Sequence, residues 1–252
     1  MQTLIVCTII GIIAQMIDGT MGMAYGVSCN TFLRSFAGLP SAVASASVHF
    51  AEMFTTLASG ISHFKLKNVD KRLFLMLLIP GIIGGVLGAY LLVNFYSSAW
   101  DPIIDIYLIL MGFIVLLKVF KKERKTREAG KYAYILGLVG GFCDAVGGGG
   151  WGPVVTSTLV ATDHDVKMTI GSVNAAEFFV TVAQSATFVF TMKAAFLENM
   201  YSILGLIIGG LIAAPFAAIL CKKIPVKPLL AIVGVLIIGT NVLKLLQHLG
   251  IV

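Results

Sequence analysis

Long apolar segments, separated by short polar ones, run along the whole chain. Several approach the roughly 20 residues that an α-helix needs to cross the apolar core of a bilayer. Each half of the chain has five apolar segments, but the second segment in each half is too short to span a membrane alone. The number of segments that could span is therefore four or five in each half. We expect helices at residues 2–17, 24–37, 41–63, 73–95 and 102–118, and again at 132–146, 153–162, 168–190, 200–220 and 228–247.

The composition agrees with this pattern. Hydrophobic residues make up 58% of the 252 residues and charged residues only 12%, whereas a soluble domain has roughly 25% charged residues. The mean hydropathy is +0.96. Because so few charged side chains could not cover a protein surface in water, we expect a multi-pass protein embedded in the lipid bilayer. The basic residues cluster between apolar segments, which indicates membrane orientation and no nucleic-acid partner.

The two halves of the chain resemble each other at an offset of 125 or 126 residues. At 126, segment 18–26 aligns with 144–152, and at 125, segment 45–60 aligns with 170–185 with seven of sixteen positions identical. The matched pairs include Asp18 with Asp144, Tyr25 with Trp151, and Glu52 with Glu177. Acidic residues are costly in a membrane, so their repetition in the same order indicates a duplication.

This repeat predicts the domain organisation. We expect a single transporter domain over residues 1–252, made of repeat 1 (1–117), a basic linker (118–131) and repeat 2 (132–252). Two fused repeats are common in secondary transporters. An inverted arrangement of the halves places more of the 18 basic residues on one side than a parallel one does, which the positive-inside rule favours. The expected fold is all-α integral membrane, with two inverted repeats and broken or re-entrant helices near the midplane.

A glycine-rich break separates the first two apolar segments of each half. Non-helical backbone at membrane depth is tolerated only where it is buried in protein or lines a cavity. The short helix after each break would direct its N-terminal amides and positive dipole end into the protein, which favours a bound anion. The substrate-binding residues expected at the two breaks are Gly22, Tyr25, Gly26, Gly148, Gly149, Gly150, Trp151 and Gly152. The IIGG stretches at 82–85 and 207–210 we assign to close helix packing.

Polar residues form a stripe along one face of the third segment in each half. The stripe comprises Ser45, His49, Glu52, Thr56 and Ser59 in the first half, and Asn174, Glu177, Thr181 and Gln184 in the second. Such a stripe faces a partner helix or a wet pathway rather than lipid. Ionisable residues inside a membrane are functional candidates, so we expect Glu52 and Glu177 to exchange protons. Only the first half has a histidine in its stripe, as expected if one half took on proton coupling.

Asp18 and Asp144 each end an apolar segment just before a break. They either cap the following turn or helix or belong to the coupling path. An acidic side chain beside an anion opposes its binding, so we do not expect these two as direct ligands. The expected proton-coupling or gating residues are Asp18, Glu52, Asp144, Glu177 and Gln184. The remaining expected substrate-binding residues are Ser47, His49, Ser172 and Asn174.

Together these motifs resemble the TauE/SafE sulfite exporter family of membrane transporters. The matching pieces are GTMGMAYG, CDAVGGGGWGP, SASVHFAEMFTTLASG and IGSVNAAEFFVTVAQS, and the resemblance covers essentially the whole chain. It implies a multi-pass protein of the cell inner membrane that exports sulfite, sulfoacetate or a related organosulfonate, driven by protons. The first break has Met21, Met23 and Ala24 where the second has glycine, so the two breaks differ in sequence.

Two other functions remain compatible with the residues. Acidic rings select cations, so Asp18, Glu52, Asp144 and Glu177 could line a cation pathway. An intramembrane hydrolase would use the two aspartates as acid and base, but no further protease-like motif accompanies them, so we expect no enzyme. The acidic loop at 163–165 has no further ligands nearby. We therefore expect no metal site and no cofactor, and the oligomeric state stays open.

Overall fold

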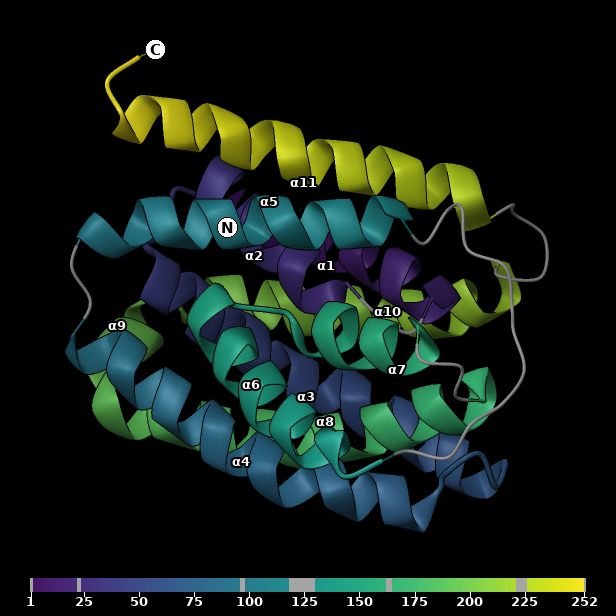
Figure 1. Ribbon diagram of the computed structural model, residues 1–252. Helices are drawn as coiled ribbons and strands as arrows, with labels where there is room; N and C mark the ends of the chain where they lie inside the picture. Colours follow the sequence, from purple (N-terminus) through teal and green to yellow (C-terminus); the bar gives the residue numbers. More distant parts are fainter. Residues whose placement is uncertain are drawn as a thin grey trace.

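The computed structural model describes residues 2–21, 24–95, 98–117, 130–161, 165–220 and 226–251, and all the regular secondary structure in these ranges is helical (Figure 1). The elements of the first half are α1 (Gln2–Met21), α2 (Tyr25–Phe36), α3 (Ser41–Lys65), α4 (Lys71–Asn94), η1 (Ser98–Trp100) and α5 (Asp101–Leu117). Those of the second half are α6 (Tyr132–Gly147), η3 (Gly152–Thr156), α7 (Ser157–Ala161), α8 (Val166–Thr191), α9 (Lys193–Glu198), α10 (Met200–Leu220) and α11 (Val226–His248).

Each apolar segment of the sequence forms a helix, with ends that differ by a few residues from the prediction. Two starts are fixed by aspartate caps that satisfy free amides of the first turn. The Asp70 carboxylate accepts from the amides of Arg72 and Leu73 at the start of α4, and Asp165 accepts from Met168 at the start of α8. The short helices η1 and α9 were not predicted. Most of the predicted linker, 118–129, lies outside the described residues.

Helix pairing follows the sequence repeat. α1 packs along α10, and α6 packs along α4. Because the repeat relates α1 to α6 and α10 to α4, these two pairings are counterparts of each other. Both are close contacts through glycine: a Cβ added at Gly84 would collide with the Leu138 carbonyl, and one added at Gly209 would collide with the Thr8 carbonyl. The IIGG stretches therefore serve helix packing, as the sequence predicted.

The helices that are counterparts of each other also pair directly, and they run antiparallel. In the α3–α8 pair, the ring of His49 lies 5.8 Å from that of Phe188, whereas Asn174 donates a 2.9 Å hydrogen bond to Ser59. Residue order along α3 thus runs opposite to that along α8. α5 and α11 lie side by side in Figure 1, and Gly112 and Leu116 of α5 contact Ile238 and Gly234 of α11 in the same reversed order.

Both halves contribute to a shared interior. One buried apolar cluster contains side chains from α1, α3, α5, α8 and α11, among them Ile17, Ala46, Leu108, Phe188 and Ile237. The other two buried clusters also contain side chains from both halves, so the described residues of the two halves pack into each other. The broken segments are held between the long helices.

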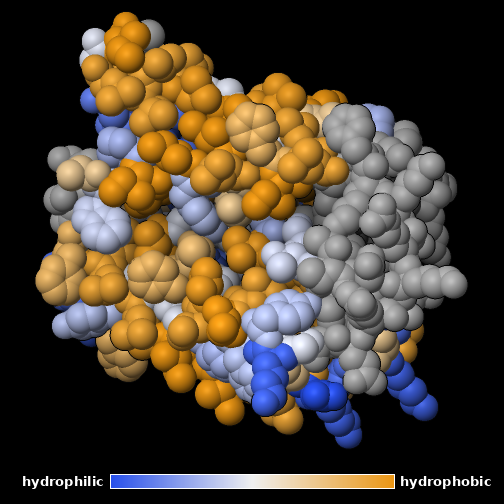
Figure 2. Space-filling view, in the orientation of Figure 1, coloured by the Kyte–Doolittle hydropathy of each residue, from blue (hydrophilic) through white to orange (hydrophobic). Residues whose placement is uncertain are grey.

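On the face shown in Figure 2, the coloured residues are largely apolar. Along α4, the side chains of Leu75, Ile79, Ile83 and Leu87 recur every four residues and are each 50–61% exposed. A contiguous face of this kind suits contact with lipid rather than water. By length and composition, Lys71–Asn94 and Met168–Thr191 are candidate membrane spans among the described residues.

Candidate functional site

The helix is interrupted in both halves where the glycine-rich motifs stand. α1 ends at Met21 and α2 starts at Tyr25, and α6 ends at Gly147 before η3 starts at Gly152. In the second break, Gly148 and Gly149 have φ values of 66° and 142°, which glycine adopts without strain. Gly22, an expected substrate-binding residue of the first break, lies outside the described residues.

The two breaks touch each other through their backbones. A Cβ added at Gly26 would lie 2.6 Å from the Gly149 Cα, and one added at Gly149 would collide with the backbone of Gly26 and Val27. The same added Cβ at Gly26 would lie 3.6 Å from Oε1 of Glu52. The breaks therefore converge, as the repeat predicted. The contact between the two glycines is direct, so any ligand would lie beside this crossing rather than between them.

Each aspartate caps the helix that follows its break. Oδ1 of Asp144 accepts a 2.9 Å hydrogen bond from the Trp151 amide, and Oδ1 of Asp18 accepts a longer one, 3.4 Å, from the Tyr25 amide. The main-chain oxygen of Asp144 also accepts from the Gly149 amide at 2.9 Å. The capping role considered from the sequence is thus present in both halves, and it occupies two of the amides that were expected to face an anion.

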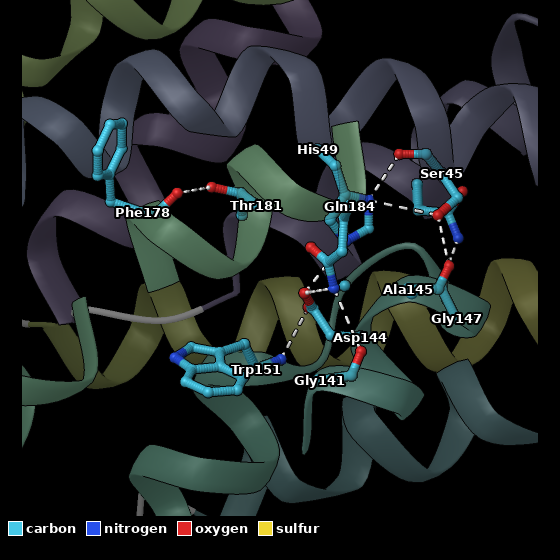
Figure 3. A network of polar contacts seen from close by, with 12 residues as sticks. Ser45, His49, Gly141, Asp144, Ala145, Gly147, Trp151, Phe178, Thr181 and Gln184 are labelled. Atoms are coloured by element: carbon cyan, nitrogen blue, oxygen red, sulfur yellow. Dashed lines mark hydrogen bonds and ion pairs between the residues drawn. The ribbon is translucent and has the colours of Figure 1, made fainter. Parts of the chain in front are cut away.

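The second carboxylate oxygen of Asp144 contacts side chains from both halves of the chain (Figure 3). Oδ2 lies 3.1 Å from Nε2 of His49 on α3 and accepts a 3.0 Å hydrogen bond from Nε2 of Gln184 on α8. All three side chains are fully buried. The Asp144 carboxyl group therefore accepts from the Trp151 amide and the Gln184 amide group, and it shares a close contact with Nε2 of His49.

The hydrogen on the His49 ring can be placed from its partners. Nδ1 lies 2.7 Å from the main-chain oxygen of Ser45, which can only accept, so Nδ1 carries a hydrogen. The contact between Nε2 and Asp144 must then contain a proton, held either as imidazolium with carboxylate or as neutral imidazole with carboxylic acid. The Ser45 hydroxyl in turn donates to the Ala145 carbonyl at 2.6 Å, which ties α3 to the end of α6.

Glu52 and Glu177 lie in the same region. Both are buried, and they interact electrostatically with each other and with Asp18 and Asp144. Oε2 of Glu52 is buried with no hydrogen-bond partner among the described residues. A buried polar atom without a partner is costly and marks a place where a proton, water or ligand would be stabilised.

Comparison with known proteins decides the family. The family described as Sulfite exporter TauE/SafE matches residues 7–243. The chain belongs to the TauE/SafE family. "Probable membrane transporter protein YtnM" of Bacillus subtilis (strain 168) is 40% identical over 255 residues, which cover 98% of this chain and 84% of that protein.

Two further relatives match more distantly. "Probable membrane transporter protein YunE" of the same bacterium is 25% identical over 153 residues, 58% of this chain and 54% of that protein. "Probable membrane transporter protein MJ0441" of Methanocaldococcus jannaschii is 25% identical over 170 residues, 63% of this chain and 64% of that protein. The chain is thus a membrane transporter of the TauE/SafE family.

The two aromatic residues of the breaks anchor this TauE/SafE protein's broken segments by packing. Nε1 of Trp151 donates to the Val173 carbonyl at 3.2 Å, and its ring lies against Gly81 of α4. The Tyr25 hydroxyl lies 3.4 Å from the Leu206 carbonyl of α10. Both side chains are fully buried, so they hold the short helices in position and contact a substrate only after a rearrangement.

Three other expected binding residues are engaged within the helix framework. The Ser47 hydroxyl donates to the Val43 carbonyl within α3. Ser172 accepts from the Asp70 amide at 2.8 Å, which joins α8 to the start of α4, and Asn174 donates to Ser59. These hydrogen bonds involve partners other than Asp144. The structure thus brings His49 and Gln184 to the second break, whereas Ser47, Ser172 and Asn174 make contacts elsewhere.

Two residues of the site were not predicted from the sequence. Asn30 of α2 donates a short hydrogen bond from its amide to the Gly147 carbonyl. The Tyr107 hydroxyl donates to the Gly149 carbonyl at 3.0 Å. Both side chains hold the second break from the first half of the chain. A polar asparagine in a short apolar helix was an available signal, whereas nothing in the sequence distinguishes Tyr107 from an interfacial tyrosine.

A second buried polar cluster joins α2 to α5 and α11, and it was also missed. Arg34 is almost fully buried, with Nη1 2.7 Å from Asp105 and Nη2 3.6 Å from Asp101. His248 lies 3.4 Å from the other Asp105 oxygen, and Ser41 donates to Asp101 at 2.6 Å. The spacing of the two aspartates, four residues apart in an apolar helix, was the signal for this cluster. Among the described residues, no group of three or more His, Cys, Asp or Glu is arranged to hold a metal.

Proposed function

We propose that this TauE/SafE protein exports a small sulfur-containing anion, sulfite, sulfoacetate or a related organosulfonate, across the inner membrane in a proton-coupled manner. The observation that carries the proposal is the donor set around Asp144. The Trp151 amide, Gln184 and His49 all point at one carboxylate oxygen pair. Such a set of N–H donors is what an oxyanion requires.

In this mechanism the Asp144 carboxylate occupies the hydrogen-bond donors that would otherwise bind the transported oxyanion. A carboxylate and a sulfite or sulfonate group present similar acceptor oxygens to N–H donors. When Asp144 takes up a proton, it gives up its charge-assisted bonds, and the donors of Trp151, Gln184 and His49 become available to the substrate. Proton uptake and anion binding are thereby linked, and the acidic residue no longer repels the anion.

Glu52 and Glu177 provide the second element of coupling. They lie beside the crossing of the breaks and interact with both aspartates. A buried carboxylate without a counter-ion is costly, so such groups are candidates for carrying protons through a membrane protein. We assign them the transfer of protons to and from the Asp144–His49 pair.

The proposed topology is a pair of inverted repeats, with the broken segments entering and leaving on the same side. The antiparallel run of α3 against α8 and of α5 against α11 supports this arrangement. Counterpart helices that cross the bilayer in opposite directions are related by an axis in the membrane plane, which is the relation of inverted repeats. Alternating access would then move the long helices about the crossing of Gly26 and Gly149.

The test is flux in proteoliposomes. The purified protein is reconstituted, and efflux of sulfite, sulfoacetate and taurine-derived sulfonates is measured with and without an imposed pH gradient. We expect flux of at least one of these anions that responds to the gradient. The proposal would be contradicted if none of the three anions were transported, either with or without the pH gradient.

A cation pathway is the second candidate, because three buried carboxyl groups and the partly buried Asp18 interact in one region. The same proteoliposomes distinguish it. Sodium uptake that proceeds without any of the three anions, and is abolished by Glu52→Gln, would establish the cation pathway instead.

A further inference from the structure

A groove opens on the outer surface between α3 and α8. Its volume is about 260 Å³, and it is lined by one face of α3 from Thr56 to Lys65 and by Ala175, Phe178 and Phe179 of α8. The side chains of Leu57 and Ile61 on its rim are 40% and 47% exposed. The groove therefore faces the surroundings of the helix bundle rather than its interior.

The shape of the groove comes from one missing side chain and one aromatic wall. Gly60 forms the floor, where an added Cβ would lie 3.6 Å from the Ala175 Cα. The rings of Phe178 and Phe179 stand nearly perpendicular, with centroids 5.1 Å apart, and form the wall on the α8 side. Apart from Thr56 and Lys65 at its two ends, every residue of the lining is apolar or glycine.

The length of the groove matches one acyl chain. From Thr56 to Lys65, α3 rises by about 14 Å at 1.5 Å per residue. This is about half of the roughly 30 Å apolar core of a bilayer, so the groove spans one leaflet. A helix of a second protein copy is about 10 Å wide and would not enter a space of this size.

Charge at one end selects the head group. Lys65 is exposed at the last residue of α3, where the chain enters the turn towards α4. A lysine at the end of an apolar groove places its ammonium group at the level of lipid phosphates and attracts anionic lipids in preference to zwitterionic ones.

We propose that the α3–α8 groove binds one acyl chain of an anionic phospholipid, whose phosphate contacts Lys65. The proposal requires only that the chain is a membrane protein, which its family shows. It does not depend on which substrate is transported. The groove lies on the surface of the pair of helices that carry Glu52 and Glu177.

Native mass spectrometry tests the head-group contact. The full-length protein is reconstituted in vesicles with equal parts of phosphatidylglycerol and phosphatidylcholine, extracted in mild detergent, and its retained lipids are counted. We expect phosphatidylglycerol to be retained about fivefold over phosphatidylcholine, the size of the effect of one lysine near an anionic lipid. Lys65→Glu removes this preference, whereas Lys71→Glu, the same charge change outside the groove, leaves it.

Substitutions in the groove test the acyl-chain contact. Leu57→Trp fills the groove from its exposed rim and reduces the number of retained lipids, and Ile61→Trp does the same from a second position. Gly60→Ala adds only a methyl group to the floor, in ordinary contact with Ala175, and should reduce lipid retention less than either tryptophan does. Unchanged thermal unfolding temperatures establish that the variants are folded.

Three outcomes would overturn the assignment. The first is equal retention of the two lipids by the unmodified protein. The second is an equal loss of preference in Lys65→Glu and Lys71→Glu. The third is a dimer that crosslinks through cysteines placed at Leu57 and Phe179, which would assign the groove to a second copy of the chain.

Discussion

Nε2 of His49 lies 3.1 Å from Oδ2 of Asp144, and the two residues come from different halves of the chain. The counterpart of His49 in the second half is Asn174, which donates to Ser59, the counterpart of Gln184. The position equivalent to His49 therefore carries a neutral amide, and that amide contacts a hydroxyl group of the first half. The titratable contact between His49 and Asp144 belongs to the second break.

Replacing His49 with Asn, the residue at the equivalent position, should uncouple flux from pH. The Trp151 amide and Gln184 still bind Asp144, so the fold is retained, but the pair can no longer hold a proton between two titratable groups. The measurement is anion flux in proteoliposomes from pH 5 to 8. His63→Asn, near the end of α3, is the control. A wild-type pH profile in His49→Asn would remove this residue from the mechanism.

Asp144→Ala should destabilise the protein more than Asp18→Ala does. The Asp144 carboxylate caps Trp151 at 2.9 Å and also contacts His49 and Gln184, whereas the Asp18 cap is longer, 3.4 Å. Loss of a cap alone costs about 1 kcal/mol, and each buried donor left without a partner adds about 1–3 kcal/mol. Thermal unfolding in detergent measures the difference.

Asp144→Asn separates the capping role of the side chain from its charge. Asparagine caps nearly as well as aspartate, so Asp144→Asn should be more stable than Asp144→Ala and close to the unmodified protein. Proton-coupled flux should stay absent in Asp144→Asn, because the amide cannot take up a proton. Stability and coupling that recover together would mean that Asp144 is a structural cap alone.

Glu52→Gln and Glu177→Gln should each abolish the response of flux to a pH gradient and leave the fold intact. Glutamine has nearly the same shape as glutamate but does not titrate. Flux is compared with and without the gradient, and circular dichroism establishes the helix content. Unchanged pH-dependent flux in both variants would defeat the assignment of these residues to coupling.

Gly26→Ala and Gly149→Ala should each prevent correct assembly of the two breaks. The added methyl group would lie within 2.6 Å of the opposite backbone or collide with it, and Gly149 also has a φ of 142°. We expect loss of the folded, monodisperse peak in size-exclusion chromatography. Gly239→Ala is the control, since no atom lies within 4 Å of its added Cβ. If all three variants assemble equally well, the breaks do not pack as described.

Arg34→Met should destabilise the protein by about 3–5 kcal/mol, because it leaves Asp105 buried without its cation. The double variant Arg34→Met, Asp105→Leu should recover most of this loss, since neither charge then needs a partner. Chemical unfolding of the four members of this cycle in detergent measures the coupling. Additive effects of the two substitutions would show that the 2.7 Å ion pair contributes nothing to stability.

The sequence by itself determined the elements and the location of the breaks. Apolar segments of about 20 residues have no stable alternative to helix in lipid, because each backbone amide must be satisfied within its own segment. Four consecutive glycines, from Gly147 to Gly150, interrupt a helix wherever they occur, and the repeat located the matching break around Gly26. The packing of IIGG stretches followed from glycine's lack of a side chain.

Only the tertiary structure decided which side chains meet. The partners of Asn30, Tyr107 and Arg34 could not be predicted from the sequence, because the contacts of each lie on helices distant in the chain. The same is true of His49, whose stripe position indicated a buried face without naming Asp144 as its partner. Periodicity fixes the face of a helix that is buried. The crossing of helices from both halves fixes what that face touches, and this depends on the packing of the whole chain.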